Sequence, residues 1–135
     1  LDEQHGGSGA DIAITQLALE ELSRQGFGGL ASAYNIHANI VMPYLQNLGT
    51  AAQCERWLPA MARGDALGAI AMTEPHAGSD LASMRTRAKR TNDGWELSGS
   101  KIFITNGQFA DLVIGCAKGR VTFFGRHPLT RLFAG

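Results

Sequence analysis

Apolar residues recur with helical spacing through the first 65 residues of the sequence. Residues 11–25 combine a wide apolar arc with a polar stripe, which predicts an amphipathic helix. On that stripe Glu20 and Arg24 have the spacing of an i,i+4 ion pair. Residues 30–42 are apolar almost all round, which predicts a central helix of a bundle. His37 lies in this apolar segment, where a hydrogen-bonded core histidine is commoner than a ligand.

Prolines, glycines and a capping pattern indicate where these helices begin and end. Pro43 should bend or end the central helix, because proline has no N–H for the helical hydrogen bond. Thr50 and Gln53 have the spacing of a capping box, which opens a third helix. We expect Pro59 to split this third helix and Gly64 to end it.

After residue 66 the apolar pattern changes to the period of two that is typical of β-strands. The expected strands are residues 67–73, 85–91, 95–98, 101–105 and 112–117. An Asn-Asp-Gly turn signal at residues 92–94 predicts a hairpin. Helices followed by an antiparallel sheet predict the α+β class, with a division near residue 66.

The net charge of zero conceals an uneven distribution of charged residues. Residues 1–84 contain three basic and nine acidic residues, whereas residues 85–135 contain nine basic and three acidic residues. No RNA-binding motif or zinc finger accompanies the basic half, so we expect no nucleic-acid partner. The two cysteines are far apart and favour free thiols, and no apolar run is long enough for a membrane span.

Residues 69–80 combine an apolar run with a polar loop and are the first candidate site. Pro75 should end the strand, and Ser79 or Asp80 can cap the helical turn that follows. Such a corner can bind phosphate through unpaired N–H groups, although many similar corners bind nothing. Glu74 has two open interpretations, a general base or a residue that stabilises the turn.

Residues 101–105 are the second candidate site. A period of two places the Phe103 ring and the Thr105 hydroxyl on one face of the expected strand, which suits a flat heterocycle with a polar edge, such as a flavin. The alternative is that both residues only fill space in a sheet. Lys101 and the basic residues from Arg85 to Arg90 are expected on solvated strand faces. The sequence shows no catalytic triad, metal-ligand cluster or GxGxxG motif.

Two motifs at matching spacing resemble the acyl-CoA dehydrogenase family. AMTEPHAGSD at residues 71–80 resembles the family's TEPGAGSD, and GSKIFITNG at residues 99–107 resembles its K-x-W/F-I-T-N-G. EQHGGSGAD and LGTAAQCERWLPAMARGD also resemble family segments, so that the resemblance covers about residues 2–117. It implies an α-helical bundle segment over residues 1–66, followed by part of an antiparallel β-barrel-like domain over residues 67–118.

The resemblance implies an FAD enzyme that converts a saturated fatty acyl-CoA to the 2-enoyl-CoA. In the family a glutamate removes the α-proton, a hydride leaves the β-carbon for flavin N5, and an electron-transferring flavoprotein reoxidises the flavin. Thr73 matches the threonine at the pyrimidine edge, Ser79 the serine between FAD and acyl-CoA, and Phe103 to Thr105 the second flavin contact. The implied cofactor contacts are Ile70, Ala71, Met72, Thr73, Ser79, Phe103, Ile104 and Thr105, and Ser79 is also the implied substrate contact.

The resemblance also implies a homo-oligomer in the bacterial cytoplasm or, alternatively, in the mitochondrial matrix. The family's catalytic glutamate matches no residue of this sequence, so we expect no catalytic residue here. The alternative function is an inactive remnant that binds FAD or acyl-CoA, or that associates with intact subunits. His76 replaces the family's usual glycine and should narrow the site or change the backbone angle. The basic tail at residues 119–135 departs from the family pattern and favours a frameshifted or aberrant end.

Overall fold

The computed structural model describes residues 1–92, 94–118 and 120–125 of the chain. Its helical part contains a short 3-10 turn, four α-helices and one π-helical segment. These are η1 (Glu3–His5), α1 (Ile12–Arg24), α2 (Gly28–Tyr34), η2 (Asn35–Val41, the π-helical segment), α3 (Met42–Leu48) and α4 (Ala51–Arg63). Strands follow the helices, which confirms the α+β order predicted from the change of period.

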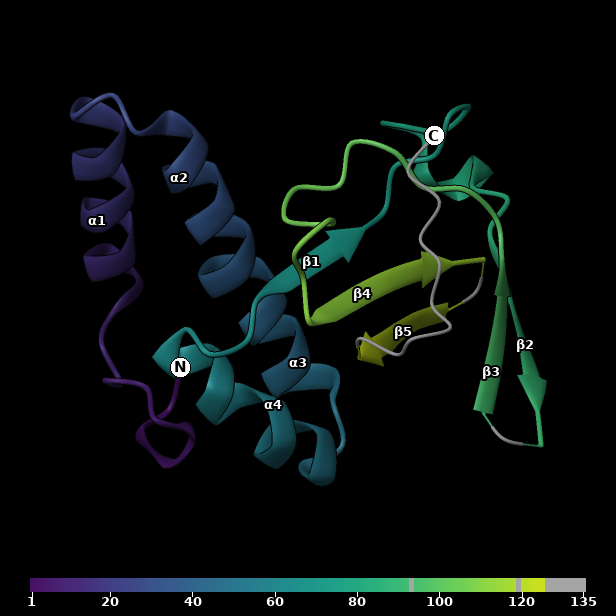
Figure 1. Ribbon diagram of the computed structural model, residues 1–135, viewed down its shortest axis with the longest axis horizontal. Coiled ribbons are helices and arrows are strands. Elements are labelled where there is room, and N and C mark those ends of the chain that lie inside the picture. Colours follow the sequence, from purple (N-terminus) through teal and green to yellow (C-terminus); the bar gives the residue numbers. More distant parts are fainter. Residues whose placement is uncertain (93, 119, 126–135) are drawn as a thin grey trace.

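Helix α1 forms the outer edge of the helical part and contacts α2 (Figure 1). It begins where the Asp11 side chain accepts a hydrogen bond from the Ala13 N–H. The predicted helix over residues 11–25 is therefore confirmed, but none of its residues is buried. The expected Glu20–Arg24 pair is wrong, because Arg24 Nη2 pairs instead with Glu21 Oε2 at 3.0 Å, with i,i+3 spacing.

The predicted central helix is part of a longer helical run that comprises α2, η2 and α3. Pro43 does not end this run, and it lies at the start of α3 within continuous helical backbone. The π-helical segment η2 comes directly before Pro43 and locally widens the helix. The interruption expected at the proline thus takes the form of a change in helical type.

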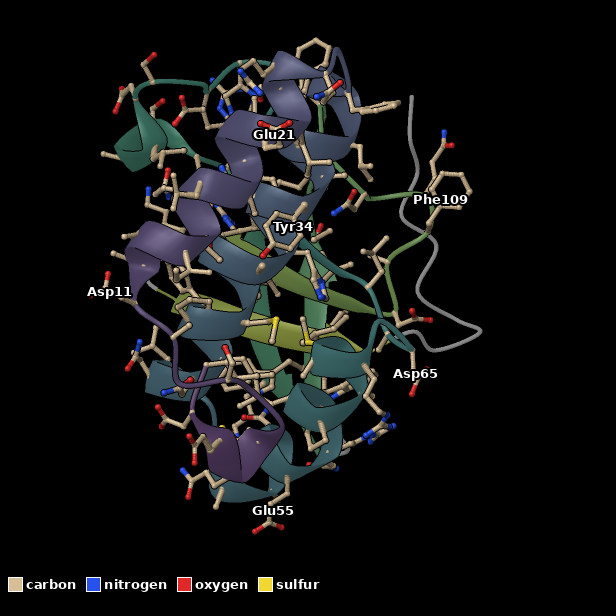
Figure 2. All side chains as sticks on the ribbon, turned by 90° about the vertical axis from the view of Figure 1, so that its left-hand side faces the viewer. Asp11, Glu21, Tyr34, Glu55, Asp65 and Phe109 are labelled. Carbon is tan, nitrogen blue, oxygen red and sulfur yellow. The ribbon has the colours of Figure 1, made fainter. Side chains whose placement is uncertain are left out.

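Helix α4 is continuous, so the prediction that Pro59 splits it is wrong. Pro59 cannot donate to the carbonyl one turn earlier, on Glu55, but Glu55 is exposed at the edge of the molecule and its carbonyl can bind water (Figure 2). The capping box is confirmed, since Thr50 Oγ1 accepts from the Gln53 N–H and Gln53 Oε1 accepts from the Thr50 N–H. Gly64 ends the helix in the left-handed conformation.

The strands form a mixed sheet and a separate hairpin. Strand β1 (Gly68–Ala71) pairs in parallel with β4 (Leu112–Ala117), which pairs antiparallel with β5 (Arg120–Gly125). Strands β2 (Arg87–Thr91) and β3 (Gly94–Ser98) form the predicted hairpin, which stands to one side of the sheet in Figure 1. The β1–β4 pair is the departure from an antiparallel sheet, and the described strands close no barrel.

The main core lies between the central helical run, α4 and the β1–β4 pair. Its fully buried side chains are Val41, Leu45, Leu58, Met61, Leu112 and Ile114. His37 joins the helices to the sheet, because its ring nitrogens lie 3.1 Å from the Met61 carbonyl oxygen and 3.0 Å from the Gly68 nitrogen, which donates to Nδ1. The prediction of a hydrogen-bonded core histidine is confirmed. Among the described helices, none has both the length and the apolar character needed to cross a membrane.

Candidate functional site

The chain leaves the sheet at Ala71 and enters the first candidate site. Glu74 and Ala77 exchange two backbone hydrogen bonds of 2.8 and 3.1 Å, which close a tight turn with Pro75 and His76 at its tip. His76 does not have a positive φ, so its backbone stays in the region that non-glycine residues ordinarily adopt. The short 3-10 helix η3 (Leu81–Ser83) follows, with Asp80 as its N-cap but without a side-chain capping bond.

Glu74 is the buried polar centre of this region. Its side chain is 1% exposed, and its oxygens accept hydrogen bonds from the Arg85 N–H at 2.6 Å, the Thr86 N–H at 2.9 Å and Lys101 Nζ at 2.9 Å. Burial raises the pKa of Glu74, but the hydrogen bonds from Thr86, Arg85 and Lys101 together outweigh it and lower the pKa from 4.5 to about 2. A general base works best with a pKa near the operating pH, so a carboxylate with a pKa of about 2 is a weak proton acceptor, which favours the turn-stabilising interpretation over a general base.

Lys101 connects the two candidate sites. Its side chain is only 7% exposed, and Nζ donates to the Met72 carbonyl and to Glu74 Oε1, both at 2.9 Å. The Ile102 N–H also donates to the Thr73 carbonyl at 3.0 Å. Residues 72–74 and 101–102 therefore lie side by side, although 27 positions separate Glu74 from Lys101 in the sequence. The expectation that Lys101 lies on a solvated strand face is wrong.

Residues 101–105 do not form the predicted strand. Phe103 has a φ of 56°, in the left-handed region that strands exclude and that costs a non-glycine residue about 1–3 kcal/mol. Beyond it, Asn106 Nδ2 donates to the carbonyls of Ala33 and Gly68 at 3.0 and 3.1 Å. Residues 103–105, called the 103–105 arch below, are thus fixed at both ends, by Lys101 and Ile102 on one side and by Asn106 on the other.

The predicted site residues fall into buried and accessible groups. Ile70 and Ala71 are 6% and 2% exposed and belong to the hydrophobic core. Met72 and Ile104 are half-buried and pack against core clusters. The accessible members are Thr73 and Thr105, both half-buried, together with the exposed Ser79 and Phe103. The bond between Ile102 and Thr73 brings the 103–105 arch next to Thr73, whereas within the described residues no hydrogen bond or ion pair joins Ser79 to the arch.

The accessible residues have the chemistry that a flavin ring requires. The Phe103 side chain is 89% exposed and offers an aromatic face for a flat heterocycle. Over the described part of the chain, the hydroxyls of Thr73, Ser79 and Thr105 make no hydrogen bond and can serve the polar edge of a ligand. The described residues contain no cluster of histidine, cysteine and carboxylate side chains that could hold a metal ion. The donor set therefore fits FAD.

Comparison with known families agrees with this chemistry. Residues 1–65 match the N-terminal domain of acyl-CoA dehydrogenase, and residues 69–131 match the middle domain of acyl-CoA dehydrogenase. The chain belongs to the acyl-CoA dehydrogenase family. The middle-domain match continues past residue 118 to residue 131, into the segment predicted to be an atypical tail.

Relatives and solved structures of the family share this fold. The chain is 50% identical over 114 residues to the mouse mitochondrial long-chain specific acyl-CoA dehydrogenase, a match that covers 84% of the chain and 26% of that enzyme. An acyl-CoA dehydrogenase from Geobacillus kaustophilus is 37% identical with a TM-score of 0.86, over 93% of this chain and 36% of that one. A glutaryl-CoA dehydrogenase from Mycobacterium smegmatis in complex with FADH2 is 36% identical with a TM-score of 0.84, over 90% of this chain and 32% of that one. The chain thus spans about a quarter of the length of its curated relative.

The sequence did not predict the roles of two residues in this candidate site. For Lys101 the sequence predicts a solvated strand face, and its buried partners, Glu74 and the Met72 carbonyl, come from a segment 27 or more positions earlier in the chain. Asn106 was identified only as a turn residue, and its φ of 66° confirms the turn. Its amide bonds to α2 and β1 could not be inferred without the fold. In contrast, Arg85, Arg87, Lys89 and Arg90 are exposed, as expected.

Proposed function

We propose that this chain forms one wall of the FAD and acyl-CoA site of an acyl-CoA dehydrogenase that oxidises a fatty acyl-CoA to the 2-enoyl-CoA. The observation that carries the proposal is the exposed Phe103 ring directly after Ile102, whose N–H bonds the Thr73 carbonyl, together with nearby hydroxyls that make no hydrogen bond within the described residues. The FADH2 complex of the Mycobacterium smegmatis relative supports the cofactor, and the name of the mouse relative supports a long-chain fatty acyl substrate. FAD would supply the hydride acceptor.

Each accessible residue has a separate role in this proposal. The Thr73 hydroxyl donates to the pyrimidine edge of the flavin, while Phe103 packs its ring against the isoalloxazine. Thr105 places its hydroxyl near N5. Ser79, in the exposed loop after the turn, lies between FAD and the acyl-CoA thioester. Ile70, Ala71, Met72 and Ile104 support these contacts through packing and backbone groups, because their side chains are at least half-buried.

The chain on its own is proposed to bind without dehydrogenating. No residue of the sequence matches the family's proton-abstracting glutamate, and the buried oxygens of Glu74 already accept hydrogen bonds from Arg85, Thr86 and Lys101. The electron-transferring flavoprotein as acceptor and a homo-oligomer belong to the proposed activity of the whole enzyme. The compartment is either the bacterial cytoplasm or the mitochondrial matrix, since the relatives come from both bacteria and mitochondria.

Two exposed phenylalanines of the same loop allow a matched test. Phe109 is 72% exposed at the edge of the molecule (Figure 2), six positions after Phe103, but lies outside the 103–105 arch. FAD binding to the 135-residue chain is measured by equilibrium dialysis for the wild type, Phe103→Ala and Phe109→Ala. Because stacking on an aromatic ring contributes about 1–3 kcal/mol, Phe103→Ala should raise the Kd about tenfold or more. Phe109→Ala should leave it unchanged.

The proposal fails if the wild type does not bind FAD, or if both substitutions weaken binding equally. Dehydrogenation is tested separately by mixing the FAD-loaded chain with a long-chain acyl-CoA without oxygen. The flavin absorbance should persist. Bleaching that depends on acyl-CoA would show that this chain contains its own base, which would contradict the proposed absence of a catalytic residue.

A further inference from the structure

The 103–105 arch is held against Thr73 by one buried ion pair, between Glu74 and Lys101. Lys101 Nζ lies 2.9 Å from Glu74 Oε1, and the two side chains are 7% and 1% exposed. A charged pair with so little solvent contact stays together, because either charge without the other would be buried unpaired. The pair therefore fixes the base of the arch to the loop that follows β1.

The remaining acceptors and donors of this pair are also occupied. Glu74 accepts the Arg85 and Thr86 N–H groups from the segment before β2, and His76 Nε2 lies 3.3 Å from Oε2. Lys101 donates its second bond to the Met72 carbonyl. The carboxylate thus connects three segments that are separate in sequence, at the point where the two flavin-facing stretches meet. Few alternative positions are available to Lys101 without breaking several bonds together.

The hydrogen bond between the Ile102 N–H and the Thr73 carbonyl, next to the pair, holds the start of the arch in place. Directly after Lys101, the Ile102 N–H donates to the Thr73 carbonyl at 3.0 Å, and Phe103 then takes its left-handed φ of 56°. A left-handed phenylalanine is retained only where its neighbours are held on both sides. Here the two sides are the Lys101 contacts and the Asn106 side-chain bonds.

We propose that Glu74 and Lys101 are positioning residues, which hold the 103–105 arch in a fixed position beside Thr73 and so set the arrangement of the two stretches that the flavin ring contacts. This inference rests on the proposed function for its ligand. Neither residue touches the cofactor in this account. Their effect passes through the Ile102–Thr73 bond to the Phe103 ring and the Thr105 hydroxyl.

The direct test is hydrogen exchange of the Ile102 amide in the 135-residue chain, with the Ile114 amide of the buried strand β4 as internal reference. In Lys101→Met the Ile102 amide should exchange about tenfold faster or more, while Ile114 exchange stays unchanged. Glu21→Gln is the matched control for Glu74→Gln, because Glu21 also pairs with a basic residue but lies exposed on the outward side of α1 (Figure 2). The control should leave Ile102 exchange unchanged.

The FAD affinity of the same variants provides the second readout. Lys101→Met and Glu74→Gln should raise the Kd for FAD about tenfold, and Glu21→Gln should not change it. If either single variant fails to fold, the double variant Glu74→Gln/Lys101→Met is used, because it leaves no unpaired buried charge. If the pair has only a structural role, the double variant should recover slow hydrogen exchange of the Ile102 amide along with its fold. If the pair positions the arch, the Ile102 amide of the double variant should still exchange fast.

The outcomes separate this inference from the proposed function. If the wild type does not bind FAD, the proposed function fails, and Ile102 exchange alone decides whether the pair positions the arch. Unchanged Ile102 exchange in a folded Lys101→Met variant overturns the inference, whatever the FAD affinity. Faster exchange with unchanged FAD affinity also overturns it, because the position of the arch would then not determine how the flavin ring is held.

Discussion

Replacing Glu74 by glutamine should change how the stability of the domain depends on pH. In the folded chain the pKa of Glu74 is lowered to about 2, by hydrogen bonds that outweigh the opposing effect of burial, whereas the ordinary value is 4.5. The unfolded chain therefore takes up a proton at this carboxyl near pH 4.5, while the folded chain resists until about pH 2. The stability that Glu74 contributes is fully present above pH 4.5 and is lost as the pH falls from 4.5 towards 2.

The size of the effect follows from the two pKa values. Between 4.5 and about 2, at about 1.4 kcal/mol per pH unit, the ionised carboxylate contributes up to about 3 kcal/mol to the free energy of unfolding. Urea unfolding followed by circular dichroism at pH 6, 4, 3 and about 2 measures this for the wild type and for Glu74→Gln. The free energy of unfolding of the wild type should exceed that of the variant at pH 6, and this difference should shrink as the pH falls. The other carboxyl groups titrate in both proteins, so their contributions cancel in the difference.

Glu21→Gln serves as the control for the loss of a carboxylate, because Glu21 is exposed beside Arg24. The reasoning is refuted if the stability difference between the wild type and Glu74→Gln is the same at pH 6 and near pH 2. It is also refuted if Glu74→Gln is as stable as the wild type at pH 6. Either result would mean that the donors from Arg85, Thr86 and Lys101 do not favour the ionised form.

Three further predictions concern packing, capping and thiol reactivity. Gly68→Ala should destabilise the fold by about 1–3 kcal/mol, because a Cβ at this position would lie 2.6 Å from Val41 Cγ1. An unchanged urea unfolding midpoint would contradict this. Thr50→Ala should cost about 1 kcal/mol of unfolding free energy by removing the bond to the Gln53 N–H, whereas Thr50→Ser should retain most of it. Burial raises the pKa of the Cys116 thiol, so at pH 7 iodoacetamide should label Cys116 more slowly than it labels a cysteine in a short peptide. Equal labelling rates would contradict this prediction.

Local signals in the sequence predicted the parts of the fold that local chemistry determines. The Thr50–Gln53 capping box begins α4 as expected, and the turn signal after Thr91 connects β2 and β3. The apolar run over residues 112–117 forms β4 with those same bounds. Each of these features depends on hydrogen bonds or burial within a short segment, which a pattern of neighbouring residues can encode.

The errors lie where contacts distant in sequence override the local pattern. Residues 101–105 alternate like a strand, but the bonds of Lys101 to Met72 and Glu74 hold them in a loop with a left-handed Phe103. The parallel pairing of β1 with β4 likewise joins segments more than 40 residues apart. For the candidate site, the sequence identified the exposed Phe103 and the hydroxyl residues. It could not show the buried pair that holds them together.

The visible absorbance spectrum tests the central claim, that this chain alone holds FAD, most directly. The purified 135-residue chain is incubated with FAD, and gel filtration then separates bound from free cofactor. The account predicts a flavin spectrum that elutes with the wild-type protein and is diminished for Phe103→Ala but not for Phe109→Ala. A folded wild-type chain that elutes without flavin absorbance would contradict it.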